Sequence, residues 1–120
     1  MAEHNDLGRL GEEVALKHLR EKGFTIRNTN WRFGKDEIDI IAEKDKYLVI
    51  VEVKTRRSAF FGEPEIFVNA GKQRFLVRAA QAYIEKNDIG LEVRFDVVSI
   101  ILNSTTKEVK HIEDAFYPVL

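Results

Sequence analysis

An unbroken apolar run, Leu48-Val49-Ile50-Val51, constrains the fold more than any other stretch of this 120-residue chain. A run without alternation is typical of a strand in the middle of a sheet that is covered on both faces. The predicted strand, residues 47–54, becomes charged at its end. There Glu52 and Lys54 lie on the same face as Leu48 and Ile50. Charged groups at the exit of a buried strand are costly unless they are paired, so both become candidates for function.

A second strand, residues 37–43, precedes this one, and a turn near Asp45 and Lys46 joins the two. The hairpin that closes at this turn sets three pairs face to face: Lys44 with Tyr47, Asp39 with Glu52, and Glu37 with Lys54. Directly opposed side chains have β-carbons about 4.5–5.5 Å apart. Two carboxylates at that distance repel each other, and a divalent cation between them reverses the sign of that cost.

The remaining elements follow from periodicity and turn residues. Apolar residues at three- and four-residue spacing predict a first helix from its cap, Asp6, to Gly23. A second helix follows the cap Asn69, and further strands are predicted over residues 24–31, 91–101 and 109–112. The expected fold is an α/β (α+β) sandwich: helix, three-strand antiparallel meander, crossover helix, and a further strand parallel to the third. The length suits a single domain, residues 1–120.

Composition removes several classes of function. With no cysteine, the chain has no disulfide, thiolate zinc site or cysteine nucleophile, which is compatible with a cytoplasmic protein. No run approaches the roughly 20 apolar residues that cross a bilayer, and the polar N-terminus lacks the apolar core of a secretory signal. The net charge of −1 does not indicate a nucleic-acid binder, although a local basic face is compatible with 19 Lys and Arg against 20 Asp and Glu.

The acidic pair permits metal chemistry. We expect Asp39 and Glu52 to hold a cation, with Glu12 reaching in from the first helix. Carboxylates and waters without sulfur or nitrogen ligands suit Mg²⁺ or Mn²⁺, and a retained water becomes a nucleophile when the cation lowers its pKa. Lys54 would then stabilise charge that develops on a phosphoryl oxygen. This set suits phosphodiester hydrolysis.

Simpler interpretations stay open for the same residues. The charges form a salt-bridged network if Lys54 neutralises Glu37 and Glu52, and a lone helical Glu12 is usually solvated. His18 lies on the apolar stripe of the first helix, where a satisfied, partly buried histidine is expected rather than a ligand. The adjacent aromatics Phe60-Phe61 pack on the core, meet a second subunit or stack on a base.

Six motifs occur in order along nearly the whole chain: Gly8-x-x-Gly11-Glu12, Asn30-Trp31-Arg32, Asp36-Glu37-Ile38-Asp39, Val51-Glu52-Val53-Lys54-Thr55-Arg56, Lys72-Gln73 and Arg94-Phe95-Asp96-Val97. As a set they resemble the YraN-type family of small bacterial proteins, which carries no settled biochemical function. The fold of that family resembles the restriction-endonuclease-like, or PD-(D/E)xK, nucleases, particularly archaeal Holliday-junction resolvases.

The resemblance assigns roles along the chain. It implies a helical acid at Glu12, a metal aspartate at Asp39 and an acid-x-lysine pair at Glu52 and Lys54, with Lys72 and Gln73 near the phosphate backbone. Ile38 replaces the proline of the nuclease motif, which many members of that superfamily also lack. The superfamily also contains inactive members that only bind.

Two main hypotheses follow. The first is a metal-dependent nuclease or nuclease-like DNA-processing protein that acts on branched DNA, with a homodimer as one arrangement. The second is a non-catalytic nucleic-acid-binding protein that keeps the fold and binds through cationic and amide side chains: Arg32, Arg56, Arg57, Lys72, Gln73 and Arg74. A third, a protein-interaction module, would use Phe60-Phe61.

Overall fold

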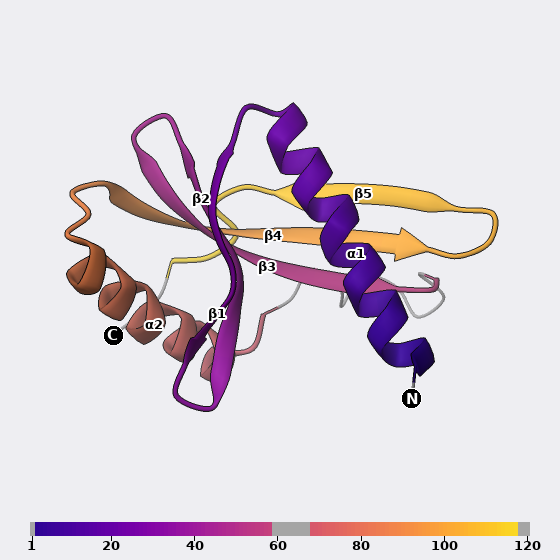
Figure 1. Cartoon of the computed structure of the whole chain (residues 1–120), viewed down its shortest axis with the longest axis horizontal. Coiled ribbons are helices and arrows are strands. Elements are labelled where there is room, and N and C mark those ends of the chain that lie inside the picture. The colour runs from indigo at the N-terminus through magenta and orange to yellow at the C-terminus, as the bar shows by residue number, and fades with distance from the viewer. Residues whose placement is uncertain (1, 59–67, 118–120) are drawn as a thin grey trace.

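Two helices and five strands make up the part of the chain that the computed structural model describes, residues 2–58 and 68–117, with side chains from residue 6 onward. Figure 1 shows their arrangement. In chain order they are α1 (Ala2–Glu21), β1 (Thr25–Phe33), β2 (Asp36–Lys44), β3 (Tyr47–Arg56), α2 (Ala70–Asn87), β4 (Glu92–Leu102) and β5 (Lys107–Ile112).

The strands form one mixed sheet in the order β1-β2-β3-β4-β5. Neighbouring strands are antiparallel except β3 and β4, which run parallel and are joined through the crossover helix α2. The sequence predicts this architecture: the helix, the three-strand meander, the crossover helix and the parallel fourth strand are all present, as is the short last strand.

The β2–β3 hairpin closes at the predicted turn. Asp45 takes a left-handed backbone conformation (φ 56°), and Lys44 pairs with Tyr47. The ladder continues to Ile40 and Val51, one pair short of the predicted Asp39–Glu52 pair. Beyond that point β2 runs away from β3 towards the β1–β2 turn (Figure 1), so the predicted contact of Glu37 with Lys54 does not belong to the ladder.

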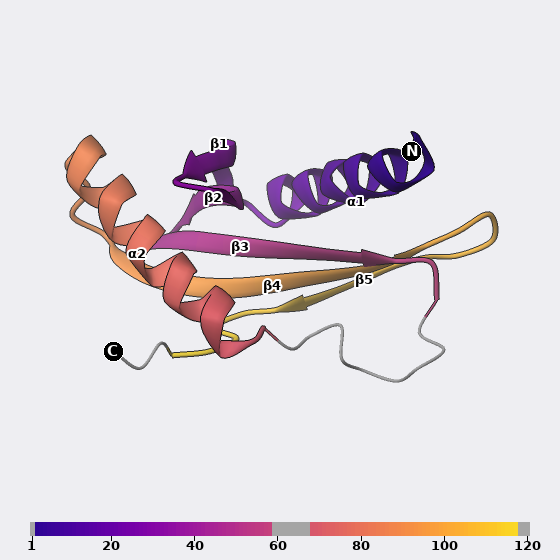
Figure 2. The same cartoon turned by 90° about the horizontal axis from the view of Figure 1, so that it is seen from below.

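Each helix covers one face of the sheet (Figure 2). Ala15 and Leu19 of α1 are fully buried in a cluster with Val49 and Val51 of β3. On the other face a larger cluster joins Leu48 and Ile50 to the buried residues of α2: Leu76, Val77, Ala79, Ala80 and Tyr83. Because both faces are covered, the apolar run of β3 lies at the centre of the molecule, as its lack of alternation predicts.

Two boundaries differ from the sequence prediction. The helix α1 begins at Ala2 rather than after Asp6, whose carboxylate pairs with Arg9 on the helix surface. The turn between β1 and β2 is shorter than predicted, because β1 extends through Phe33 and Gly34 (φ 66°) makes the bend. Phe60-Phe61 lies outside the described residues. Within them, neither helix has the length and apolar character to span a bilayer.

Candidate functional site

The separation of β2 from β3 opens a hollow of about 460 Å³ at the edge of the α1 face. Four elements contribute to its lining: Gly8 and Glu12 from α1, Asn30 from β1, Glu37 and Asp39 from β2, and Val53 and Thr55 from β3. Two of the predicted metal ligands, Glu12 and Asp39, therefore face the same space. The third, Glu52, is not part of this lining and lies beside Asp39 on the α2 side.

Asp39 is held in place by the backbone of the neighbouring strand. Its Oδ2 accepts a hydrogen bond from the Val53 amide at 2.8 Å. This bond connects the two strands just beyond the last backbone pair of their ladder. Burial and then the charge of Glu52 raise the pKa of Asp39 to about 7, against the opposing effects of the Val53 amide and Lys72. Both the low polarity of the site and a second acid thus act on this carboxyl group.

Glu52 is largely enclosed, with 13% of its side chain exposed. Its Oε1 is buried and has no hydrogen-bond partner among the described residues, although the Lys72 ammonium lies 3.9 Å from it. Burial raises the pKa of Glu52, and the nearby charges of Lys72 and Lys54 oppose that rise. A buried carboxylate oxygen without a donor is rare in folded proteins and calls for a partner.

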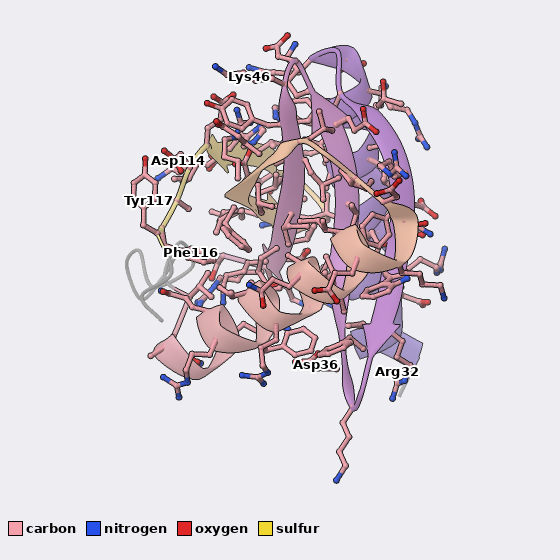
Figure 3. All side chains as sticks on the ribbon, turned by 90° about the vertical axis from the view of Figure 1, so that its left-hand side faces the viewer. Arg32, Asp36, Lys46, Asp114, Phe116 and Tyr117 are labelled. Carbon is pink, nitrogen blue, oxygen red and sulfur yellow. The ribbon has the colours of Figure 1, made fainter. Side chains whose placement is uncertain are left out.

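Lys72 brings a positive charge to the acids from α2. Asn69 caps this helix by accepting the Lys72 amide at 2.8 Å, which fixes the first turn. The Lys72 ammonium then lies 3.1 Å from Asp36 Oδ2 and 3.9 Å from Glu52 Oε1. Burial opposes ionisation of Asp36, but the Glu37 amide and Lys72 outweigh it and lower the pKa of Asp36. Figure 3 shows Asp36 beside α2, near the end of the β1–β2 hairpin.

Glu12 reaches the hollow because α1 approaches β3 closely. A β-carbon added to Gly11 would lie 2.0 Å from Thr55 Oγ1, so only glycine allows this approach. The Glu12 Oε1 accepts a hydrogen bond from the Asn30 side-chain amide at 3.1 Å. Asn30 itself has a left-handed backbone (φ 49°). Gly11, the small residue beside Glu12, thus lets α1 approach β3 closely.

The other predicted site residues take different positions. Lys54 influences Glu52 through its charge. Arg32, Arg57 and Arg74 are exposed and Arg56 is partly exposed. The Gln73 amide donates to the Val68 carbonyl at 2.8 Å, so this group is engaged within its own chain.

Sequence reasoning missed three groups of the site: Asp36, Asn30 and Thr55. All three belong to motifs that were recognised: Asp36-Glu37-Ile38-Asp39, Asn30-Trp31-Arg32 and Val51-Glu52-Val53-Lys54-Thr55-Arg56. The contacts of Asp36 with Lys72 and of Asn30 with Glu12, however, join segments that are distant in the sequence.

Two side chains of the site have the oxygen donors that a hard divalent cation prefers. Asp39 and Glu52 supply carboxylate oxygens, and Glu52 Oε1, which accepts no hydrogen bond from the described residues, is an oxygen that a cation would satisfy. Over residues 2–58 and 68–117 no group of three or more His, Cys, Asp or Glu side chains is gathered closely enough to hold a metal. The three-ligand set of Glu12, Asp39 and Glu52 therefore stays a prediction.

Comparison with known proteins gives one consistent result. The model of the family described as Uncharacterised protein family UPF0102 matches residues 11–100. A UPF0102 protein of Flavobacterium psychrophilum is 50% identical over 117 residues, covering 98% of each chain. One of Bacteroides thetaiotaomicron is 48% identical over 100% of this chain and 99% of its own, and one of Porphyromonas gingivalis is 48% identical over 97% and 87%.

Proposed function

We propose the function of this chain from its site, because the chain belongs to the UPF0102 family, which is described only as uncharacterised. UPF0102 is the YraN-type family that the motifs of the chain indicate. The proposal is a divalent-cation-dependent nuclease that hydrolyses phosphodiester bonds in DNA, with Mg²⁺ or Mn²⁺ as the cation. The observation that carries it is the buried Glu52 oxygen, which accepts no hydrogen bond from the described residues and lies beside Asp39, whose pKa is raised to about 7. A purely structural role would not favour this arrangement, because burial and repulsion between the acids both destabilise the fold.

In this mechanism Asp39 and Glu52 would hold the cation, and Asn30 keeps Glu12 pointed into the hollow. A bound cation would supply Lewis-acid chemistry and activation of a water. The Val53 amide fixes the orientation of Asp39, so that one carboxylate oxygen stays available. Lys54, which lies near Glu52, offsets negative charge that develops on a phosphoryl oxygen.

Substrate binding rests on cationic side chains of the elements that carry the site. Arg32 lies near the end of β1, Arg56 ends β3, and Arg74 lies on α2 two residues after Lys72. Such side chains bind phosphates without reading sequence. The preference for branched DNA, and a homodimer that binds it, come from the resemblance to junction resolvases.

The direct test is cleavage by the purified protein. Linear, flapped and four-way DNA are incubated with Mg²⁺ or Mn²⁺, and the wild type is compared with the isosteric variants Asp39→Asn and Glu52→Gln. We expect cutting by the wild type only when the cation is present, and a loss of about 100-fold or more in each variant, since even groups that merely support a metal ligand are worth about 10–100-fold. Glu85→Gln, an exposed acid on α2, is the matched control. Cutting that survives Asp39→Asn and Glu52→Gln together would show that another site is responsible.

A second function has its own support. Lys72 already lies within 3.9 Å of Glu52 and 3.1 Å of Asp36, so the acids carry a counter-charge from the protein itself. This favours the non-catalytic alternative, in which the fold binds nucleic acid through its surface cations. Salt-dependent DNA binding that is weakened by Arg32→Gln and Arg74→Gln but unchanged by Asp39→Asn, without Mn²⁺ binding in calorimetric titration, would support it over the nuclease.

A further inference from the structure

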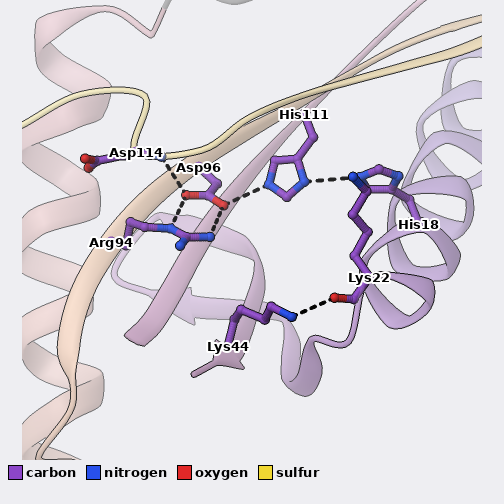
Figure 4. Close-up of polar contacts among 7 residues, drawn as sticks. All are labelled: His18, Lys22, Lys44, Arg94, Asp96, His111 and Asp114. Atoms are coloured by element: carbon purple, nitrogen blue, oxygen red, sulfur yellow. Dashed lines mark hydrogen bonds and ion pairs between the residues drawn. The ribbon is translucent and has the colours of Figure 1, made fainter. Parts of the chain in front are cut away.

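A chain of three polar side chains joins α1 to the sheet on the face opposite α2 (Figure 4). Asp96 of β4 has a fully buried side chain, and its Oδ2 lies 2.8 Å from Nε2 of His111 on β5. The other ring nitrogen of His111, Nδ1, lies 3.1 Å from Nε2 of His18 on α1. His18 adjoins a second hollow, of about 370 Å³, between α1 and β5.

The buried end of this chain has a fixed charge. Arg94 donates two hydrogen bonds of 2.9 Å to the carboxylate of Asp96, and the Asp114 amide donates a third at 3.0 Å. Burial opposes ionisation, but His111, Arg94 and the Asp114 amide outweigh it and lower the pKa of Asp96. Asp96 is therefore an acceptor throughout the neutral range.

This fixed acceptor decides how the two histidines are paired. His111 donates from Nε2 to Asp96, which leaves Nδ1 of the neutral ring as an acceptor. His18 then donates from Nε2 to this acceptor. If His111 gains a proton, its Nδ1 donates to Nε2 of a neutral His18 instead, so the hydrogen bond is lost only when both rings are cationic. Two cationic rings 3.1 Å apart would also repel each other.

We propose that Asp96, His111 and His18 form a pH-sensitive clasp that holds α1 on the sheet while at least one of the two imidazoles is neutral and releases the helix when both are protonated. The link passes through His18, which lies about one turn after the buried Ala15 and directly before the buried Leu19. The effect on catalysis rests on the proposed function, because the same helix carries Glu12 to the acidic hollow. The clasp itself does not depend on that function.

The charges around the pair agree with this direction. Burial and then His111 and Lys22 lower the pKa of His18, and Glu21 opposes them. The remaining charged groups near the pair come from four elements: Glu13 and Lys17 on α1, Lys107 on β5, Arg94 and Asp96 on β4, and Lys44 on β2. Because the docked helix disfavours the charged ring, docking is fully present above the ordinary histidine pKa of 6.5 and is lost as the pH falls through the lowered value.

Hydrogen exchange of the wild-type protein tests the clasp without a substrate. We expect the protection of α1 amides, corrected for intrinsic exchange, to fall several-fold between pH 7.5 and 5.5, while α2 amides change little. The variant His18→Gln keeps a donor for His111 but does not titrate, so its α1 protection should be equal at both values of pH. Lys44→Met is the matched control: it removes the hydrogen bond of 2.9 Å from Lys44 to the Lys22 carbonyl and should weaken α1 equally at both.

A measurement on the wild type alone guards against a variant that folds poorly. In an NMR titration, the His18 ring should titrate below 6.5, and α1 amide shifts should follow the same midpoint. Amides of α1 that ignore this midpoint, or an equal loss of protection in α2, would overturn the clasp. Because neither readout involves a metal or DNA, a failure of the nuclease proposal leaves this result unaffected.

Discussion

At the scale of single residues, Asp39 has opposite consequences for folding and for cation binding. Its pKa is raised to about 7 by burial and by Glu52. An unfolded aspartate titrates near 3.9. The folded protein therefore binds more protons than the unfolded chain between these values, and its stability falls as the pH rises through that window. The same repulsion favours a divalent cation, because the cation removes it.

We predict from this that Asp39→Asn stabilises the cation-free protein at alkaline pH. At pH 5 the two proteins should differ little, and at pH 8 the variant should be more stable by about 1–3 kcal/mol, because it has no charge to desolvate. Urea unfolding in EDTA from pH 5 to 8 measures the difference. The titration of His18 is common to both proteins and cancels. A difference that does not change with pH would show that Asp39 is not perturbed in the cation-free protein.

Asn30 combines a backbone role with a side-chain role, and two substitutions separate them. Asn30→Gly keeps the left-handed conformation and loses only the contact with Glu12, whereas Asn30→Ala loses both. We predict that Ala costs about 1–2 kcal/mol more stability than Gly. Both variants should cut DNA more slowly than the wild type, to a similar extent. Thermal unfolding measures the backbone effect, and cleavage assays measure the side-chain effect. Cutting by Asn30→Gly at the wild-type rate would show that the contact with Glu12 is not needed for catalysis.

At the scale of elements, the docking of α1 on β3 depends on one glycine. A β-carbon on Gly11 would lie 2.0–2.8 Å from three side-chain atoms of Thr55, whereas one on Gly8 would meet nothing within 4 Å. We predict that Gly11→Ala destabilises the protein by about 1–3 kcal/mol and that Gly8→Ala stabilises it by about 0.5–1 kcal/mol.

Urea unfolding at pH 7.5 compares the two alanine variants. Adding Thr55→Ala to Gly11→Ala removes two of the three clashing atoms and should restore part of the loss. If both alanine variants are stabilising, the helix does not approach the strand as closely as this structure shows.

The elements were predictable where their causes are local. The apolar run of β3, the turn at Asp45 and the cap at Asn69 each act within a few residues, and the predicted strands and the second helix agree with the structure to within a few residues. The predicted start of α1 after Asp6 is wrong, because Asp6 lies within the helix and pairs with Arg9 instead of capping it. The β2–β3 ladder ends one pair before the predicted pair of Asp39 and Glu52. At this point the Asp39 carboxylate, instead of a backbone carbonyl, accepts the hydrogen bond of the Val53 amide.

The site was less predictable, for the same physical reason. The predicted acids lie close together because strand periodicity and the hairpin turn constrain them. The contact of Lys72 with Asp36 and the contact of Asn30 with Glu12 depend on how α2 and α1 cross the sheet. Crossing geometry comes from packing of the whole core, which a pattern in one strand does not encode.

At the scale of the whole molecule, the cation and the fold should stabilise each other. The site draws on α1, β1, β2 and β3, with Lys72 from α2, so the unfolded chain has no equivalent site. A ligand that binds only the folded state stabilises it by about 2.7 kcal/mol at a concentration 100 times its dissociation constant. We predict that Mn²⁺ raises the melting temperature in proportion to the logarithm of its concentration once the site is half filled, and that Glu52→Gln abolishes the effect.

The measurement is thermal unfolding at pH 7.5 over micromolar to millimolar Mn²⁺. KCl keeps the ionic strength constant, so that screening of surface charge does not imitate binding. Glu85→Gln, whose acid is exposed on α2, should respond as the wild type does. The dissociation constant from these shifts should match that from calorimetric titration, because both report the same folded-state site. A wild-type melting temperature that does not respond to Mn²⁺ would mean that Lys72 already supplies the counter-charge that Asp39 and Glu52 require, and that the fold serves binding alone.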